Sequence, residues 1–95
     1  MNEPLLRLYI AGNSAISRRA EQNLSRLQEL IKPQGWEAEV VDVLAQPERA
    51  EHARILATPT LSYEHPVRPR RIVGDLSDTK SVLDFLGIEL KRDTA

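Results

Sequence analysis

The sequence contains no cysteine. The side chains that we consider as candidates for chemistry are serine hydroxyls, the two histidines and the clustered arginines. Without cysteine, thiol nucleophiles, disulfides, cysteine-ligated zinc and iron–sulfur clusters are excluded. The segment "AGNSAIS" places Asn13, Ser14 and Ser17 directly after an apolar run, where turn formers and helix caps are common. A serine without an activating base is a poor nucleophile, so we assign no catalytic residue.

The two histidines each stand beside a glutamate: Glu51 precedes His52, and Glu64 precedes His65. Adjacent residues point in different directions, whereas metal ligands converge on one point and are fixed by second-shell partners. We therefore interpret both histidines as solvated surface residues and predict no metal site. No glycine-rich phosphate-binding loop is present, and we predict no cofactor.

The segment "VRPRR" concentrates Arg68, Arg70 and Arg71 in and after an expected turn. Guanidinium groups suit bidentate pairing with a carboxylate or phosphate, so this cluster is a candidate contact with a protein partner. Three further arginines are expected to face outward from the first helix: Arg18, Arg19 and Arg26.

Size and charge narrow the function classes. A chain of 95 residues with 41% hydrophobic content is predicted to be one domain with one core. Its net charge of -1 argues against general nucleic-acid binding. No apolar run approaches the roughly 20 residues of a membrane span, and the start "MNEPLLRLYI" does not resemble a signal peptide, so we expect a cytoplasmic protein.

The first half of the chain reads as a strand, a long helix and a second strand. Residues 5–11 form a branched and aromatic run, and residues 36–44 are centred on valines. Between them, Ser14 is the expected helix cap, and Pro33 and Gly35 end the helix. Its expected apolar face consists of Ile16, Ala20, Leu24, Leu27 and Ile31. A strand–helix–strand unit of this kind predicts two parallel neighbouring strands.

The second half predicts a short helix, two strands and a last helix. Pro47 suits a first helical position, and the inner side of the short helix is expected to carry Ala50, Ala53 and either Leu56 or Ala57. Strands are expected at 60–64 and 70–73. Ser77 is the expected cap of a helix with Val82, Leu83 and Leu86 that ends at Gly87. The order β-α-β-α-β-β-α is that of an α/β thioredoxin-like domain, in which we expect a cis Thr58–Pro59 bond.

One segment supports two assignments. In "SVLDFLGIEL", residues 81–90, Val82, Leu83 and Leu86 have helical spacing, whereas Leu86, Ile88 and Leu90 alternate as in a strand.

Three blocks resemble the KaiB family of circadian clock proteins and their bacterial relatives: "LRLYIAGNS", "VVDVLAQPERAEHARILATPTL" and "VRPRRIVGDLSD". The resemblance implies one KaiB-like domain over 1–95, with a core at about 5–90 and a disordered tail at 91–95. It implies a non-enzymatic module that binds the N-terminal ring of a KaiC-type hexameric ATPase and competes with a histidine kinase whose sensor domain is KaiB-like. It also implies metamorphic behaviour, with a βαββααβ form in dimers or tetramers and a thioredoxin-like monomer that binds the ring.

Carried over by position, the resemblance places ring contacts at Arg19 and Arg54. It places a surface for a further, KaiA-like partner on the exposed face of Glu37–Asp42, at Glu37, Glu39 and Val41. The expected fold-switch positions are Thr58, Pro59, Phe85 and Gly87. Phe85-Leu86-Gly87 stands where the family usually has Gly-Leu-Asp, and "KRDTA" replaces an acidic tail, so this chain is expected to favour the thioredoxin-like state.

Two alternatives stay open from the residues alone. One is a cysteine-free thioredoxin-like enzyme that activates a small thiol such as glutathione through Ser14 or Tyr9. The other is a KaiB-like sensor domain detached from a histidine kinase.

Overall fold

The described residues, 5–64 and 69–87 of a computed structural model, form strands and helices in the order β-α-β-α-β-β-α. The elements are β1 (Leu5–Ile10), α1 (Ala15–Ile31), the 3₁₀ helix η1 (Lys32–Gln34), β2 (Glu37–Asp42), α2 (Pro47–Ala53), β3 (Thr60–Tyr63), β4 (Arg70–Val73) and α3 (Thr79–Leu86). This order confirms the thioredoxin-like prediction. The segment that supported two assignments is helical as far as Leu86, whereas Ile88, Leu90 and the expected tail lie outside the described residues.

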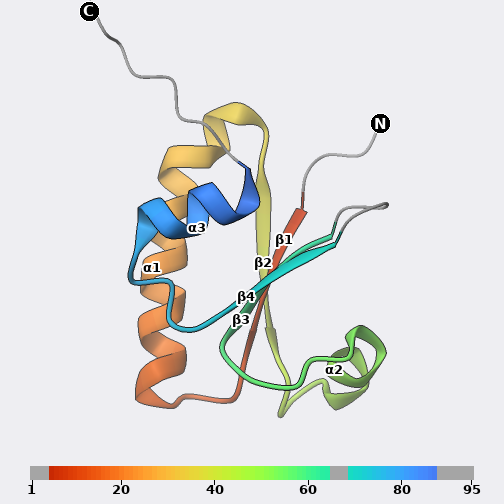
Figure 1. Cartoon of the computed structure of the whole chain (residues 1–95). Helices are drawn as coiled ribbons and strands as arrows, with labels where there is room; N and C mark the ends of the chain where they lie inside the picture. Colours follow the sequence, from red (N-terminus) through yellow and green to blue (C-terminus); the bar gives the residue numbers. More distant parts are fainter. Residues whose placement is uncertain (1–4, 65–68, 88–95) are drawn as a thin grey trace, which may run out of the picture.

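The strands form one mixed sheet in the order β2-β1-β3-β4. β1 pairs in parallel with β2, as the strand–helix–strand unit predicts, and antiparallel with β3, which in turn pairs antiparallel with β4. Figure 1 shows α1 and α3 on one side of this sheet and α2 at the end where β1 and β2 finish. The molecule therefore has two helices on one face of the sheet and a short helix on the other.

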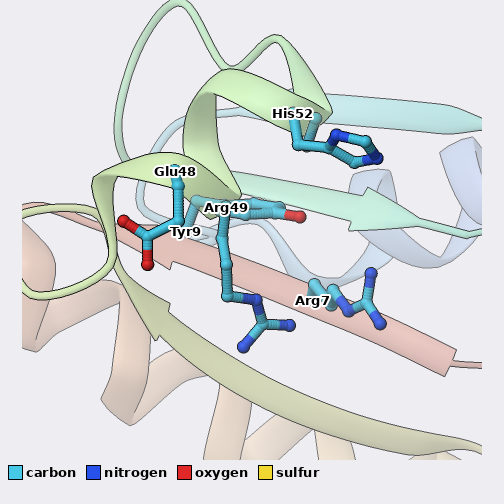
Figure 2. Close-up of a pocket in the computed structure, with 6 residues that line it drawn as sticks. Arg7, Tyr9, Glu48, Arg49 and His52 are labelled. Carbon is cyan, nitrogen blue, oxygen red and sulfur yellow. The ribbon is translucent and has the colours of Figure 1, made fainter.

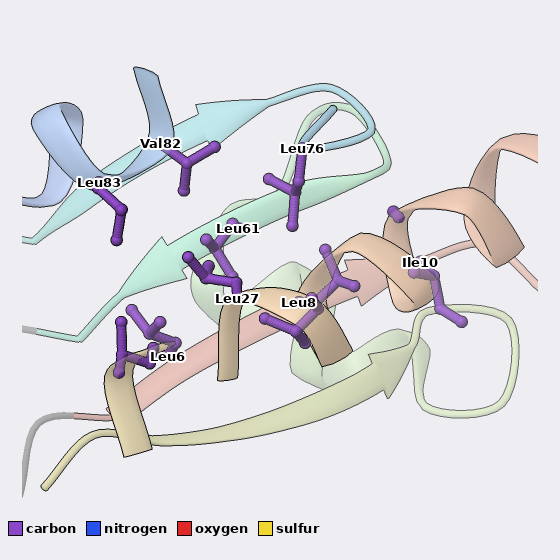
Figure 3. Close-up of a cluster of buried hydrophobic side chains, with 11 residues drawn as sticks. Leu6, Leu8, Ile10, Leu27, Leu61, Leu76, Val82 and Leu83 are labelled. Carbon is purple, nitrogen blue, oxygen red and sulfur yellow. The ribbon is translucent and has the colours of Figure 1, made fainter. Parts of the chain in front are cut away.

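The hydrophobic core lies between the sheet and the helices α1 and α3 (Figure 3). Alternate side chains of β1 point to opposite faces of the sheet, so Leu6, Leu8 and Ile10 enter this core together. The remaining core residues are Ala20, Leu24, Leu27, Ile31, Leu61, Leu76, Val82 and Leu83.

Helix α1 begins at the expected cap, but its buried face is shifted by one residue at the first turn. Ser14 accepts a hydrogen bond from the Ser17 backbone N–H, as a helix cap does. The prediction that Ile16 is in the core is wrong, because its side chain is 46% exposed. Ser17 is buried instead, and its hydroxyl oxygen accepts a hydrogen bond from the Ala11 N–H at 3.2 Å. A polar residue therefore joins β1 to α1 where an apolar one was expected.

Among the other elements, β4 has the predicted bounds, whereas β1, β2, β3 and α2 differ from the predictions by one to three residues at one or both ends. The strands end at Ile10 and Asp42 because backbone turns follow at once. Helix α2 starts at Pro47, as predicted, but stops at Ala53, so neither Leu56 nor Ala57 lies on its inner side. The helix stops here because Arg54 adopts a left-handed conformation, which a helix cannot continue through.

Helix α3 has the predicted end but a different start. Asp78, and not Ser77, is the cap, because the Asp78 carboxylate accepts the Ser81 N–H at 3.1 Å. Gly87 ends the helix in a left-handed conformation, as predicted. The Thr58–Pro59 bond is cis, which also confirms the prediction. None of the helices in the described part of the chain is long and apolar enough to cross a membrane.

The buried Ser17 generates a stability prediction. Replacing Ser17 with Ala removes the acceptor of the Ala11 N–H, and an unsatisfied buried donor costs about 1–3 kcal/mol. Urea unfolding should show this loss, whereas Ser25→Ala, at an exposed position of the same helix, should change the free energy of unfolding by less than about 0.5 kcal/mol. Equal effects of the two substitutions would contradict the role of Ser17.

Candidate partner-binding site

The end of the sheet where β1 and β2 finish is built from loops that are fixed by side-chain hydrogen bonds. The Asp42 carboxylate accepts the backbone N–H of Gly12 and that of Leu44, each at 2.9 Å. These bonds lower the pKa of Asp42, because they stabilise the ionised carboxylate. Gly12 has a φ of +65°, and a Cβ there would lie 2.9 Å from the Leu44 side chain, so the two loops are in close contact.

The loop between α2 and β3 carries the most exposed large apolar side chain of the described residues. Leu56 is 98% exposed, whereas Pro59, three residues later, is fully buried. The loop is attached to the sheet at its far end, because the Thr60 hydroxyl donates to the Ala57 carbonyl at 2.6 Å and the Gly74 N–H donates to the Pro59 carbonyl at 2.9 Å. Leu56 is therefore held out from the protein by an ordered loop.

The predicted ring contacts Arg19 and Arg54 both lie at this end of the molecule. Arg54 is exposed and directly follows α2. Arg19 lies in the first turns of α1 and is 61% exposed, with its guanidinium 3.4 Å from the Asp75 carboxylate. Hydrogen bonds from Ser77, and then the charge of Arg19, hold the pKa of Asp75 below its usual value.

The predicted second surface on β2 is only partly exposed. Glu37 is exposed and lies at the start of the strand, away from the end that carries Arg54. The prediction that Val41 lies on an exposed face is wrong: its side chain is fully buried. Val41 is paired with Tyr9 across the two strands, on the face of the sheet that α2 covers.

Glu39 is engaged in an ion-pair cluster that joins β1, β2 and α2. Its Oε1 atom lies 2.6 Å from Arg7 Nε and 2.7 Å from Arg49 Nη2. Glu64 adds a weaker contact, 3.6 Å from Arg7 Nη1. The hydrogen bond from Arg49, followed by that from Arg7, holds the pKa of Glu39 below its usual value.

A pocket of about 340 Å³ adjoins this cluster, between α2 and β1 (Figure 2). Tyr9 is buried beneath α2. The pocket is lined by Arg7, Tyr9, Glu48, Arg49, His52 and Ala53. Because both arginines are already paired with Glu39, the pocket offers little net positive charge to a small anion. The cluster is better suited to fixing α2 to the sheet.

The chemistry of a small-thiol enzyme finds little support in this geometry. The Ser14 hydroxyl caps α1 and donates to the Ser17 hydroxyl at 2.9 Å. Among residues 5–64 and 69–87, no histidine or carboxylate bonds to Ser14 that could act as its base. Tyr9 is 1% exposed and faces α2 on the other side of the sheet.

Two arginines of "VRPRR", Arg70 and Arg71, have intramolecular partners. Arg70 donates to the Phe85 carbonyl at the end of α3, at 3.2 Å, and Arg71 donates to the Ala53 and Arg54 carbonyls at the end of α2. The prediction that they are free to contact a partner is therefore not supported for these two, and Arg68 lies outside the described residues. His52 is exposed, as predicted, and His65 is not described. Within the described ranges, no three acidic or histidine side chains are placed to hold a metal ion.

The sequence analysis missed Leu56 as an exposed residue. Its apolar character suggested an inward position, and no local residue type indicates that α2 ends before it at the left-handed Arg54. Asp42 was also missed, because its two backbone partners come from different loops.

Comparison with known proteins gives one family and one fold. The family model described as "KaiB domain" matches residues 7–88. Circadian clock protein KaiB3 from Synechocystis is 43% identical over 90 residues, covering 95% of this chain and 86% of the relative. Circadian clock oscillator protein KaiB from Synechococcus elongatus is 44% identical over 86 residues, covering 90% and 82%.

Solved structures with the same fold include thioredoxins. Yeast mitochondrial thioredoxin 3 superimposes with a TM-score of 0.75 at 17% identity, covering 93% of this chain and 81% of the thioredoxin. The N-terminal domain of Synechococcus elongatus SasA superimposes with a TM-score of 0.69 at 21% identity, covering 100% of this chain and 90% of that domain. The fold is therefore thioredoxin-like.

The ion-pair cluster generates a pH-dependent prediction. Because the pKa of Glu39 is lower in the folded chain than in the unfolded chain, its contribution to stability is full at about pH 7 and is lost as the pH falls below about 4. Glu39→Gln should lower the free energy of unfolding by no more than about 1 kcal/mol at neutral pH, since its side chain is 40% exposed. Urea unfolding should show this difference shrinking towards about pH 2.

The matched control is Glu37→Gln on the same strand, because no described residue forms an ion pair with Glu37. It should leave the stability unchanged at either pH. If the difference in free energy of unfolding between the wild type and Glu39→Gln were larger in acid than at neutral pH, the stabilising role of the Glu39 ion pairs would be contradicted.

Proposed function

Because the chain belongs to the KaiB family, we propose that it is a non-enzymatic interaction module that binds the N-terminal ring of a KaiC-type hexameric ATPase in clock or related timing and stress signalling. The observation that carries this proposal is the loop after α2, where Arg54 and Leu56 are exposed beside one another. Burying a leucine side chain is favourable by about 1.5–3 kcal/mol, and an adjacent arginine adds specificity for an acidic group. Such a pair is suited to a protein partner.

Arg19 supports a second contact at the same end of the molecule. Its guanidinium is 61% exposed and makes one long ion pair with Asp75, so it can also reach a partner. Because surface pairs of this kind contribute little to stability, exchanging the Asp75 contact for one with the ring costs little.

Two further parts of the proposal concern other partners. A histidine kinase whose sensor domain has the same fold would compete for the ring, and the fold likeness to the SasA N-terminal domain supports this idea. A KaiA-like partner would use the outer part of β2 around Glu37 and Glu39; Val41 is excluded by its burial.

The thioredoxin-like form described here is proposed as the binding-competent state, with a βαββααβ dimer or tetramer as its alternative. The proposed switch region spans Thr58, Pro59, Phe85 and Gly87. Phe85 is 40% exposed, and Gly87 ends α3 with a φ of +74°. If the ring selects one of two states, the apparent affinity falls in proportion to the population of that state.

Binding should be tested by gel filtration with a cognate KaiC-type ring and ATP after overnight incubation. The wild-type chain should co-elute with the ring, and Leu56→Ala or Arg54→Ala should weaken binding at least about tenfold, since each removes about 1.4 kcal/mol or more of interface energy. Arg26→Ala is the matched control, because Arg26 is an exposed arginine on α1 without a described partner.

Failure of the wild type to co-elute with any cognate ring would overturn the proposed function. Co-elution that is equally insensitive to both loop substitutions would place the contact elsewhere on the molecule.

A further inference from the structure

The two neighbouring arginines of β4 reach the C-termini of two different helices. Successive side chains of a strand point to opposite faces, so Arg70 lies on the α3 side of the sheet and Arg71 on the α2 side. Arg70 donates to the Phe85 carbonyl, whereas Arg71 donates to the Ala53 carbonyl and, at 3.3 Å, to the Arg54 carbonyl. Cations at helix C-termini satisfy carbonyls that have no partner within the helix.

At the C-terminus of α2, an arginine occupies a position that requires a left-handed backbone conformation. The Arg54 N–H bonds to the Glu51 carbonyl and the Ile55 N–H to the Ala50 carbonyl at 2.9 Å, which is the pattern of a Schellman motif. This motif requires a left-handed residue, a place usually taken by glycine. Here it is Arg54, with a φ of 57° and a ψ of 47°. A left-handed conformation is unfavourable for a residue with a side chain, so the turn needs additional support.

Arg71 supplies that support at the two peptide planes that define the conformation of Arg54. The Ala53 carbonyl belongs to the peptide before Arg54, and the Arg54 carbonyl belongs to the peptide after it. One planar guanidinium that bonds to both carbonyls restrains both φ and ψ of Arg54. The direction of the Arg54 side chain, and the path of the chain to Leu56, follow from these two angles.

We propose that Arg71 is a positioning residue for partner binding: through the C-terminus of α2 it sets the orientation in which Arg54 and Leu56 meet the ring. This inference rests on the proposed function. Arg71 does not itself contact the partner, and thereby has an intramolecular role in place of the phosphate or carboxylate contact expected from the sequence.

The first test does not require the partner. In Arg71→Met, amide hydrogen exchange at Arg54 and Ile55 should be at least about tenfold faster than in the wild type, because their turn has lost its tie to β4. Exchange at Leu8 and Leu61, in the centre of the sheet, should stay unchanged and shows that the variant is folded. Unchanged exchange at Arg54 and Ile55 would overturn the positioning role, whether or not any ring binds.

The second test measures ring affinity. Arg71→Met should weaken binding about tenfold, equivalent to about 1.4 kcal/mol, and Arg71→Lys should recover part of this because an ammonium group can still donate to one carbonyl. Arg26→Met, the control for loss of a surface charge, should change affinity less than about twofold. Binding unaffected by Arg71→Met would overturn the inference.

A double-mutant cycle distinguishes positioning from direct contact. In a background that carries Arg54→Ala and Leu56→Ala, the loop no longer presents these side chains, so Arg71→Met should weaken the remaining binding less than about twofold. A full effect of Arg71→Met in that background would mean that Arg71 touches the ring itself, which contradicts the proposal. Failure of the wild type to bind any ring bears on the proposed function, whereas the exchange experiment still decides the role of Arg71.

Discussion

The position of β1 in the centre of the sheet is the constraint on which the rest of the structure depends. β1 is hydrogen-bonded to β2 on one side and to β3 on the other, and side chains on each of its two faces pack against helices. Leu6, Leu8 and Ile10 point towards α1 and α3 and form the centre of the core. Arg7 and Tyr9 point to the opposite face, where α2 can cover them only because Glu39 lies between Arg7 and Arg49. A charged strand face thus has a short, polar helix as its cover.

The proposed binding end follows from that arrangement. It is built from loops, and the short helix α2 contributes little apolar contact of its own, so single side chains determine the shape. Asp42 holds the loops after β1 and β2 together, and Arg71 holds the turn after α2. Loops that are fixed in this way can expose Leu56 and Arg54 in a defined orientation at little cost to the core.

The sequence predicted the features that depend on the spacing of apolar residues and on the positions of helix caps, glycines and prolines. The order of elements, the cap at Ser14 and the stop at Gly87 follow from local residue types, and the cis Thr58–Pro59 bond was expected from the thioredoxin-like order. Predictions failed where a contact from a distant segment decides the outcome. Ser17 is buried because Ala11 needs an acceptor, and Val41 is buried because α2 covers the face that it shares with Tyr9. Arg70 and Arg71 point to opposite faces of an edge strand, and their partners, the carbonyls at the ends of α3 and α2, depend on where these helices pack.

The central claim is that the thioredoxin-like form is the one that meets the ring. The most direct measurement is solid-state NMR of the isotope-labelled chain sedimented with a KaiC-type ring, read at Thr79–Leu86. The account predicts helical Cα and Cβ shifts across this segment, together with cross-strand contacts between Leu8 and Leu61 that report the antiparallel pairing of β1 and β3. Strand-type shifts at Thr79–Leu86 in the ring-bound chain, without the contact between Leu8 and Leu61, would contradict it.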